Sequence, residues 1–156
     1  MNLADILDSR SVLPNVKAQN KKQLLHELAH AASEFTGLPQ HTILETLVRR
    51  ETLGSTGLGQ GIAIPHGKIR DLGQVFGLFA RLAAPIDFDA VDNEPVDIVF
   101  LLLAPEHAGA DHLKALARIS RLLRDSETTK KLRGTDSAAG LYAILTEPRA
   151  SASHAA

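Results

Sequence analysis

One glycine-rich stretch, residues 54–68, constrains the fold of this chain more than any other. It reads Gly-Ser-Thr-Gly-Leu-Gly-Gln-Gly-Ile-Ala-Ile-Pro-His-Gly-Lys, and four of its first eight residues are glycine. Glycine at this density allows positive φ angles and close approach to the backbone. The short apolar run 62–64, with its two β-branched isoleucines, suits a strand, which Pro65 ends because proline has no N–H to donate. His66 then follows on a loop held by a rigid scaffold, where reactive side chains are commonly presented.

The rest of the chain alternates between strand and helix patterns. Residues 96–103 form the most apolar run and lack period-two alternation, which predicts a central strand covered on both faces. Asn20 and Gln23 resemble a capping box, and Gly37 supplies the helix stop. Further strands are expected at 11–14 and 75–82, and further helices at 39–51, 112–124 (capped by Asp111), 126–134 and 136–146. We therefore predict an α/β layered domain with helices on both faces of a sheet.

The length of the chain predicts a single domain, and its composition excludes several classes of function. With 156 residues, we expect a single domain at 1–147 and a disordered tail at 148–156. No cysteine is present, which excludes disulfides, thiolate catalysis and Cys-based zinc sites. The net charge of −1 argues against nucleic-acid or anionic-membrane binding. The N-terminus lacks the features of a signal peptide, and no apolar run is long enough for membrane insertion, so we expect a cytoplasmic protein.

Two groups of potential metal ligands lead to no metal prediction. His26 and His30 are four residues apart, but no third ligand follows at recognisable spacing. Asp87, Asp89 and Asp92 do not continue into an EF-hand loop. We expect no metal and no cofactor.

The residues that accompany His66 point to phosphoryl transfer. His112 is expected in the first turn of a helix, where free N–H groups favour an anion. Arg50 ends the helix that leads into the glycine loop, and Arg offers a forked donor to phosphate oxygens. A neutral imidazole can attack an activated phosphorus in line while the protein stabilises the charge. The residues leave open which ring nitrogen reacts.

Competing readings of the same residues fit less well. A nucleotide-binding P-loop needs Lys-Ser/Thr after its glycines, which this loop lacks. Ser55 and His66 invite a Ser-His-Asp hydrolase, but no Gly-x-Ser-x-Gly elbow is present. His112 and Arg50 can each be ordinary helix-end residues, and Lys68 is expected to be solvated.

The segment 50–59 running into 61–68, together with 85–97, resembles the enzyme IIA component of the bacterial phosphoenolpyruvate phosphotransferase system. The resemblance is to the fructose–mannitol class and, within it, to the nitrogen-regulatory branch. It implies a mixed central sheet flanked by helices in three layers. It further implies that His66 is the phosphorylated nucleophile, that His112 stabilises the phosphoryl group and that Arg50 stabilises the active site. The supporting loop residues are Gly54, Ser55, Thr56, Gly57 and Gly67.

The same resemblance implies a set of partners. The donor is a histidine-containing phosphocarrier (NPr or HPr) charged by enzyme I, with phosphoenolpyruvate as the upstream donor. The output is regulatory, through target proteins that handle potassium transport or act as sensor kinases. The alternative is a sugar-specific enzyme IIA that passes phosphate to a permease B domain. A third hypothesis is a binding module in which His66 is never phosphorylated.

Overall fold

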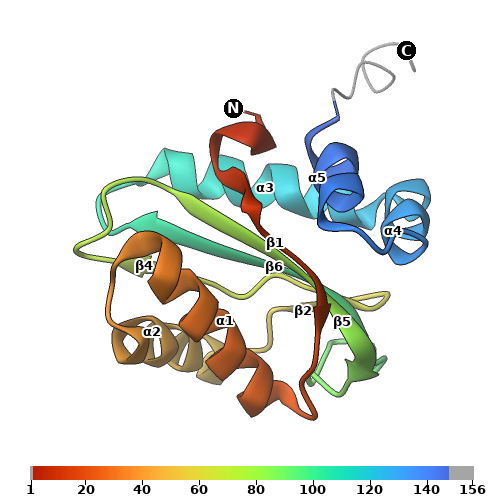
Figure 1. Ribbon diagram of the computed structural model, residues 1–156. Helices are drawn as coiled ribbons and strands as arrows, with labels where there is room; N and C mark the ends of the chain where they lie inside the picture. Colours follow the sequence, from red (N-terminus) through yellow and green to blue (C-terminus); the bar gives the residue numbers. More distant parts are fainter. Residues whose placement is uncertain (1, 148–156) are drawn as a thin grey trace.

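The computed structural model describes residues 2–147, so the tail predicted at 148–156 lies outside the described residues. Figure 1 shows the arrangement of the elements. In chain order they are η1 (Leu3–Asp5), β1 (Leu7–Val16), α1 (Lys21–Thr36), α2 (Gln40–Thr52), β2 (Gly57–Gly59), β3 (Ile62–Ala63), β4 (His66–Ile69), β5 (Phe76–Ile86), β6 (Val96–Pro105), α3 (Ala110–Arg124), α4 (Ser126–Arg133) and α5 (Ala138–Thr146).

The six strands form one mixed sheet with β6 at its centre. The strand order is β1-β5-β6-β3-β2, and β4 also pairs with β6. β5 runs antiparallel to β6, whereas β3 and β4 run parallel to it. β3 and β4 share one register against β6, because Ile62 pairs with Ile98 and His66 pairs with Leu102. They are therefore one strand interrupted at residues 64 and 65, just before His66.

Helices cover both faces of the sheet, which confirms the predicted three-layer α/β fold. Successive residues of β6 point to opposite faces, as the strand pleat requires. Val99, Leu101 and Leu103 pack in the core with α1 and α2. Phe100 and Leu102 pack in the core with α3, α4 and α5. Figure 1 shows α1 and α2 on one side of the sheet and α3, α4 and α5 on the other.

Local signals placed the ends of α1 correctly. The Asn20 side chain accepts a hydrogen bond from the Gln23 N–H at 2.8 Å. The Gln23 side chain bonds back to Gln19 rather than to Asn20. Gly37 ends the helix with a φ of 77°, in the left-handed region that glycine adopts readily.

Four expectations about element boundaries were wrong. β5 continues to Ile86, four residues beyond the expected end at 82, and includes Pro85. β1 extends from Leu7 to Val16 and includes Pro14, which is tolerated because β1 is an edge strand. α3 begins at Ala110 after Gly109, so Asp111 lies in its first turn and does not cap it. His66 is the first residue of β4 rather than part of a loop, because pairing with β6 resumes directly after Pro65.

Candidate active site around His66

His66 is held by a hydrogen bond from its own ring to the strand that precedes it. Its Nδ1 lies 2.8 Å from the carbonyl oxygen of Ile64. A carbonyl oxygen only accepts hydrogen bonds, so Nδ1 carries the proton and donates. In the neutral ring the unprotonated nitrogen is then Nε2. The hydrogen bond to Ile64 thus leaves Nε2 as the nitrogen with a free lone pair in the neutral ring.

The carbonyl of Ile64 is itself well fixed. The Ile64 side chain is 2% exposed, and its N–H donates to the Thr56 carbonyl at 3.1 Å. On the next residue, the Pro65 carbonyl accepts from the Leu102 N–H at 3.0 Å. The turn before His66 is therefore tied both to the glycine loop and to the central strand.

The fold brings His112 next to His66 from the first turn of α3. The two ring centroids are 5.7 Å apart, with the ring planes at 45°. His112 is buried, and its Nδ1 has no hydrogen-bond partner among residues 2–147. A buried polar atom without a partner carries a desolvation cost, and such atoms often mark sites where a ligand completes the bonding.

Arg50 lies in the last turn of α2 and contributes positive charge to the site. Its Nη1 donates to the Gly54 carbonyl at 2.8 Å, which fixes the guanidinium against the start of the glycine loop. Its charge acts on His66 and disfavours the protonated imidazole. The structure therefore gathers Arg50, His66 and His112, the three predicted site residues, into one region.

The two imidazoles are biased toward the neutral form. Burial is the main cause that lowers the pKa of His66 from its ordinary value, and the Arg50 charge adds to it. The bond to Ile64 and the charge of Glu51 oppose this shift. Burial also lowers the pKa of His112, followed by the charges of His66 and Lys68. A neutral imidazole has a lone pair on one ring nitrogen, which in His66 is Nε2 because Nδ1 donates to Ile64.

Lowering the pH tests this electrostatic arrangement. We expect His66 and His112 to titrate below the ordinary histidine value of about 6.5. Below that value the unfolded chain binds protons before the folded chain, so the free energy of unfolding should fall as the pH falls. NMR titration of the two ring Cε1–H signals measures the midpoints, and urea unfolding across the same range measures stability. A His66 midpoint at or above the ordinary value would contradict the prediction.

The glycine loop is built largely from its own hydrogen bonds. The Gly54 N–H bonds to the Glu51 carbonyl, the Thr56 N–H to the Glu51 side chain, and the Gly57 N–H to the Ser55 hydroxyl. These three N–H donors are thus occupied and are not free to bind a phosphate. The loop shapes the site mainly by positioning its neighbours.

Two glycines of the site are required by close packing. A Cβ on Gly57 would lie 2.9 Å from the Cα of Ala90, in the connection between β5 and β6. A Cβ on Gly67 would lie 2.5 Å from Cγ2 of Thr46 on α2. Gly67 therefore lets β4 approach α2.

Sequence reasoning missed one residue of this region, Glu51. It was assigned only to the end of the predicted helix, but its side chain is 6% exposed and bonds to Lys21 and Thr56. Helical spacing was the available signal, because Glu51 lies four residues after the buried Leu47 and eight after the buried Ile43, on the same face of α2.

The described residues show no metal cluster and no spanning helix. Within residues 2–147, no three His, Asp or Glu side chains are grouped to hold a metal ion. None of the helices in that range combines the length and apolar character needed to cross a bilayer.

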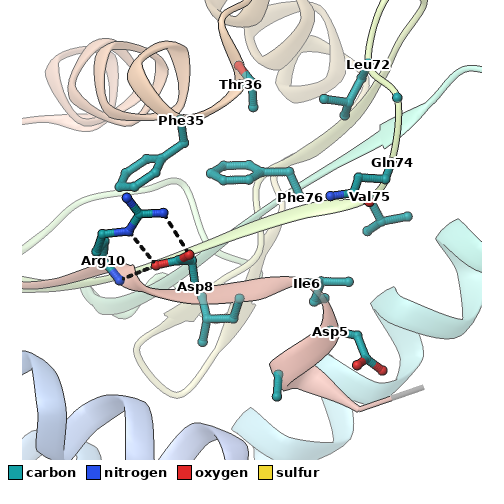
Figure 2. A pocket seen from close by; sticks show the side chains of 13 residues that line it. Asp5, Ile6, Asp8, Arg10, Phe35, Thr36, Leu72, Gln74, Val75 and Phe76 are labelled. Carbon is teal, nitrogen blue, oxygen red and sulfur yellow. Dashed lines mark hydrogen bonds and ion pairs between the residues drawn. The ribbon is translucent and has the colours of Figure 1, made fainter.

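A separate hollow of about 400 Å³ lies where β1 and β5 meet the end of α1. Figure 2 shows the Arg10–Asp8 ion pair on one side of it and Phe35 and Phe76 on the other. None of the predicted site residues lines this hollow.

Comparison with known proteins agrees with this geometry. Residues 5–147 match the family described as phosphoenolpyruvate-dependent sugar phosphotransferase system, EIIA 2. A nitrogen regulatory protein of Bradyrhizobium diazoefficiens is 54% identical over 152 residues, covering 97% of this chain and 99% of that protein. The crystal structure of nitrogen regulatory protein IIA-Ntr from Neisseria meningitidis superposes with a TM-score of 0.88 at 36% identity, over 92% of this chain and 99% of the other. The mannitol IIA of Escherichia coli shares the fold, with a TM-score of 0.75 at 18% identity over 88% of this chain and 97% of the other.

Proposed function

We propose, from the premise that this chain belongs to the EIIA type 2 family of the phosphoenolpyruvate-dependent sugar phosphotransferase system, that His66 is its phosphoryl acceptor. The observation that carries the proposal is the 2.8 Å bond from His66 Nδ1 to the Ile64 carbonyl. It leaves Nε2 as the nitrogen with a free lone pair, beside His112 and near the charge of Arg50.

The transfer step follows from this arrangement. The Nε2 lone pair attacks the phosphorus of a donor phosphohistidine in line, and a new N–P bond forms. The N–P bond to the donor ring breaks, and its electron pair returns to the donor nitrogen. Nδ1 of His66 keeps its proton throughout, because the Ile64 carbonyl still accepts it. The Arg50 guanidinium and the His112 ring are the groups that offset charge on the transferred oxygens.

The donor and the output complete the proposal. The donor is a histidine phosphocarrier of the NPr or HPr type, charged by enzyme I from phosphoenolpyruvate. The phosphorylated and unphosphorylated forms bind different target proteins in the cytoplasm, because a phosphoryl group adds about −1.5 to −2 charge at the surface. The relatives named nitrogen regulatory protein support this regulatory output over delivery to a sugar permease.

The proposal is tested with phosphoenolpyruvate, enzyme I and the phosphocarrier in one mixture. Intact-mass measurement under alkaline conditions should show one acid-labile phosphate on the wild-type protein. Adding a fructose- or mannitol-type permease B domain should leave that phosphate in place, and its rapid discharge would favour the sugar-specific alternative. A wild-type protein that stays unmodified, with a donor pair proven active on another acceptor, would leave the binding module as the better hypothesis.

Replacing the second histidine should slow the transfer without abolishing it. We expect His112→Ala to accept phosphate about 10²-fold more slowly, the size of effect seen when one stabilising donor is removed. Quenched-flow sampling with mass detection measures the rate. His26→Ala on the exposed surface of α1 is the matched control and should transfer at the wild-type rate. Equal rates in wild type and His112→Ala would show that His112 has no part in stabilising the phosphoryl group.

A further inference from the structure

Glu51 is a carboxylate enclosed at the end of α2, and it contacts the supporting loop of the site at Thr56. Its side chain is 6% exposed. One carboxylate oxygen accepts from Lys21 Nζ at 2.9 Å and from the Thr56 N–H at 3.0 Å, and the other accepts from the Thr56 hydroxyl. A buried charge is retained in a protein only when it is paired and hydrogen-bonded in this way.

From Glu51 an unbroken series of hydrogen bonds runs to His66. Glu51 holds both the N–H and the hydroxyl of Thr56. The Thr56 carbonyl accepts from the Ile64 N–H at 3.1 Å, and the Ile64 carbonyl accepts from His66 Nδ1 at 2.8 Å. The orientation of the carbonyl that sets the His66 tautomer thus depends on where Thr56 lies, and Glu51 determines that position.

The surroundings of Glu51 join segments that are distant in sequence. Lys21, at the start of α1, lies 4.6 Å from the ring centre of Phe88. The Phe88 carbonyl accepts from the Ser55 hydroxyl at 2.9 Å, so the connection between β5 and β6 is tied to the same loop. Lys21 also pairs with Glu51, and the hydrogen bonds from Thr56 connect Glu51 to the backbone that holds His66.

We propose that Glu51 is a positioning residue for phosphoryl acceptance: through Thr56 and Ile64 it holds His66 with Nδ1 protonated and Nε2 free. The inference rests on the proposed phosphorylation of His66. The role of Glu51 differs from that of its neighbour Arg50: Arg50 supplies positive charge to the site, whereas Glu51 fixes the orientation of the His66 ring.

Three variants separate geometry from charge. Glu51→Ala removes both acceptor oxygens from Thr56. Glu51→Gln keeps one oxygen for Lys21 and the Thr56 N–H, and its amide can donate to the Thr56 hydroxyl. Glu45→Ala is the matched control, since Glu45 lies on the same helix, carries the same charge and is 68% exposed in a surface pair with Arg49.

Two readouts follow each variant. The first is the ¹⁵N NMR pattern of the His66 ring in the unphosphorylated protein, which reports the tautomer without any phosphotransfer. The second is the rate of phosphate uptake from the charged phosphocarrier. We expect Glu51→Ala to populate both tautomers and to accept phosphate about 10- to 100-fold more slowly, as a small misplacement of a reacting group does. We expect Glu51→Gln to keep the tautomer and to stay within about threefold of wild type, since neutral hydrogen bonds replace charged ones.

The outcomes distinguish the inference from its premise. A wild-type protein that takes up no phosphate would overturn the function of His66, while the tautomer comparison would still test Glu51. Equal slowing in Glu51→Gln and Glu51→Ala, or slowing without a tautomer change, would show that Glu51 acts through its charge and would overturn the positioning role. If Glu51→Ala unfolds, Thr56→Val tests the same connection, because it removes only the hydroxyl bond and keeps the Lys21–Glu51 pair; an unchanged tautomer and rate there would also count against the proposal.

Discussion

A His66→Ala variant should take up no phosphate from the charged phosphocarrier under conditions in which the wild-type protein is fully phosphorylated. In the proposed step the Nε2 lone pair of His66 is the nucleophile that forms the new bond to phosphorus, and the variant lacks it. His112 should not substitute for it, since its ring is buried at the start of α3. Intact-mass spectrometry of the two proteins in parallel is the measurement.

The variant must be shown to be folded for this result to count. His66 begins β4, whose backbone pairs with β6 independently of the side chain. We therefore expect urea unfolding of His66→Ala to differ from wild type by about 1 kcal/mol, a typical effect of one substitution. A folded variant that still gains one phosphate would place the acceptor elsewhere and refute the assignment of His66.

Replacing Phe100 with alanine should have the largest effect on stability. Phe100 is 0% exposed in the middle of β6, and its ring lies edge-on to that of Phe79, with centroids 6.5 Å apart. The ring also covers Gly77, where an added Cβ would lie 2.9 Å from the Phe100 Cε1. We expect the free energy of unfolding to fall by about 3–5 kcal/mol, from lost burial and from the cavity that remains.

Urea denaturation at constant pH measures this loss. A domain of this size is stable by about 5–15 kcal/mol, so the variant should unfold at much lower urea concentration. Val91→Ala is the control, because Val91 is 76% exposed and a surface change of this kind alters stability by about 0.5 kcal/mol or less. A Phe100 variant as stable as this control would mean that the core between the sheet and α3 contributes little to the fold.

Several features of the fold could be predicted because their causes are local. The most apolar run, at 96–103, predicted a strand buried on both faces, and β6 is the centre of the sheet. Asn20 and Gly37 predicted the ends of α1 through capping and a left-handed turn. These signals depend only on residues a few positions apart, so they can be read from the sequence without the tertiary structure.

The predicted strand boundaries were wrong where pairing with a strand distant in sequence determines where a strand begins or ends. Pro14 looked like the end of a strand, but β1 continues past it because the edge position leaves its missing N–H without consequence. His66 looked like a loop residue after Pro65, but β6 offers it a partner at Leu102. Neither partner can be identified from the local pattern.

By itself the sequence determined the layered α/β fold, the family and the set of candidate site residues, because apolar periodicity, caps and a long motif are local in the chain. Only the tertiary structure decided that Nε2 is the free nitrogen of His66, that His112 lies 5.7 Å from it, and that Glu51 is buried. The first depends on the position of the turn before His66, the second on the position of α3, and the third on the position of Lys21 in α1. Such contacts join residues that packing of the whole core brings together, and no spacing within one segment specifies them.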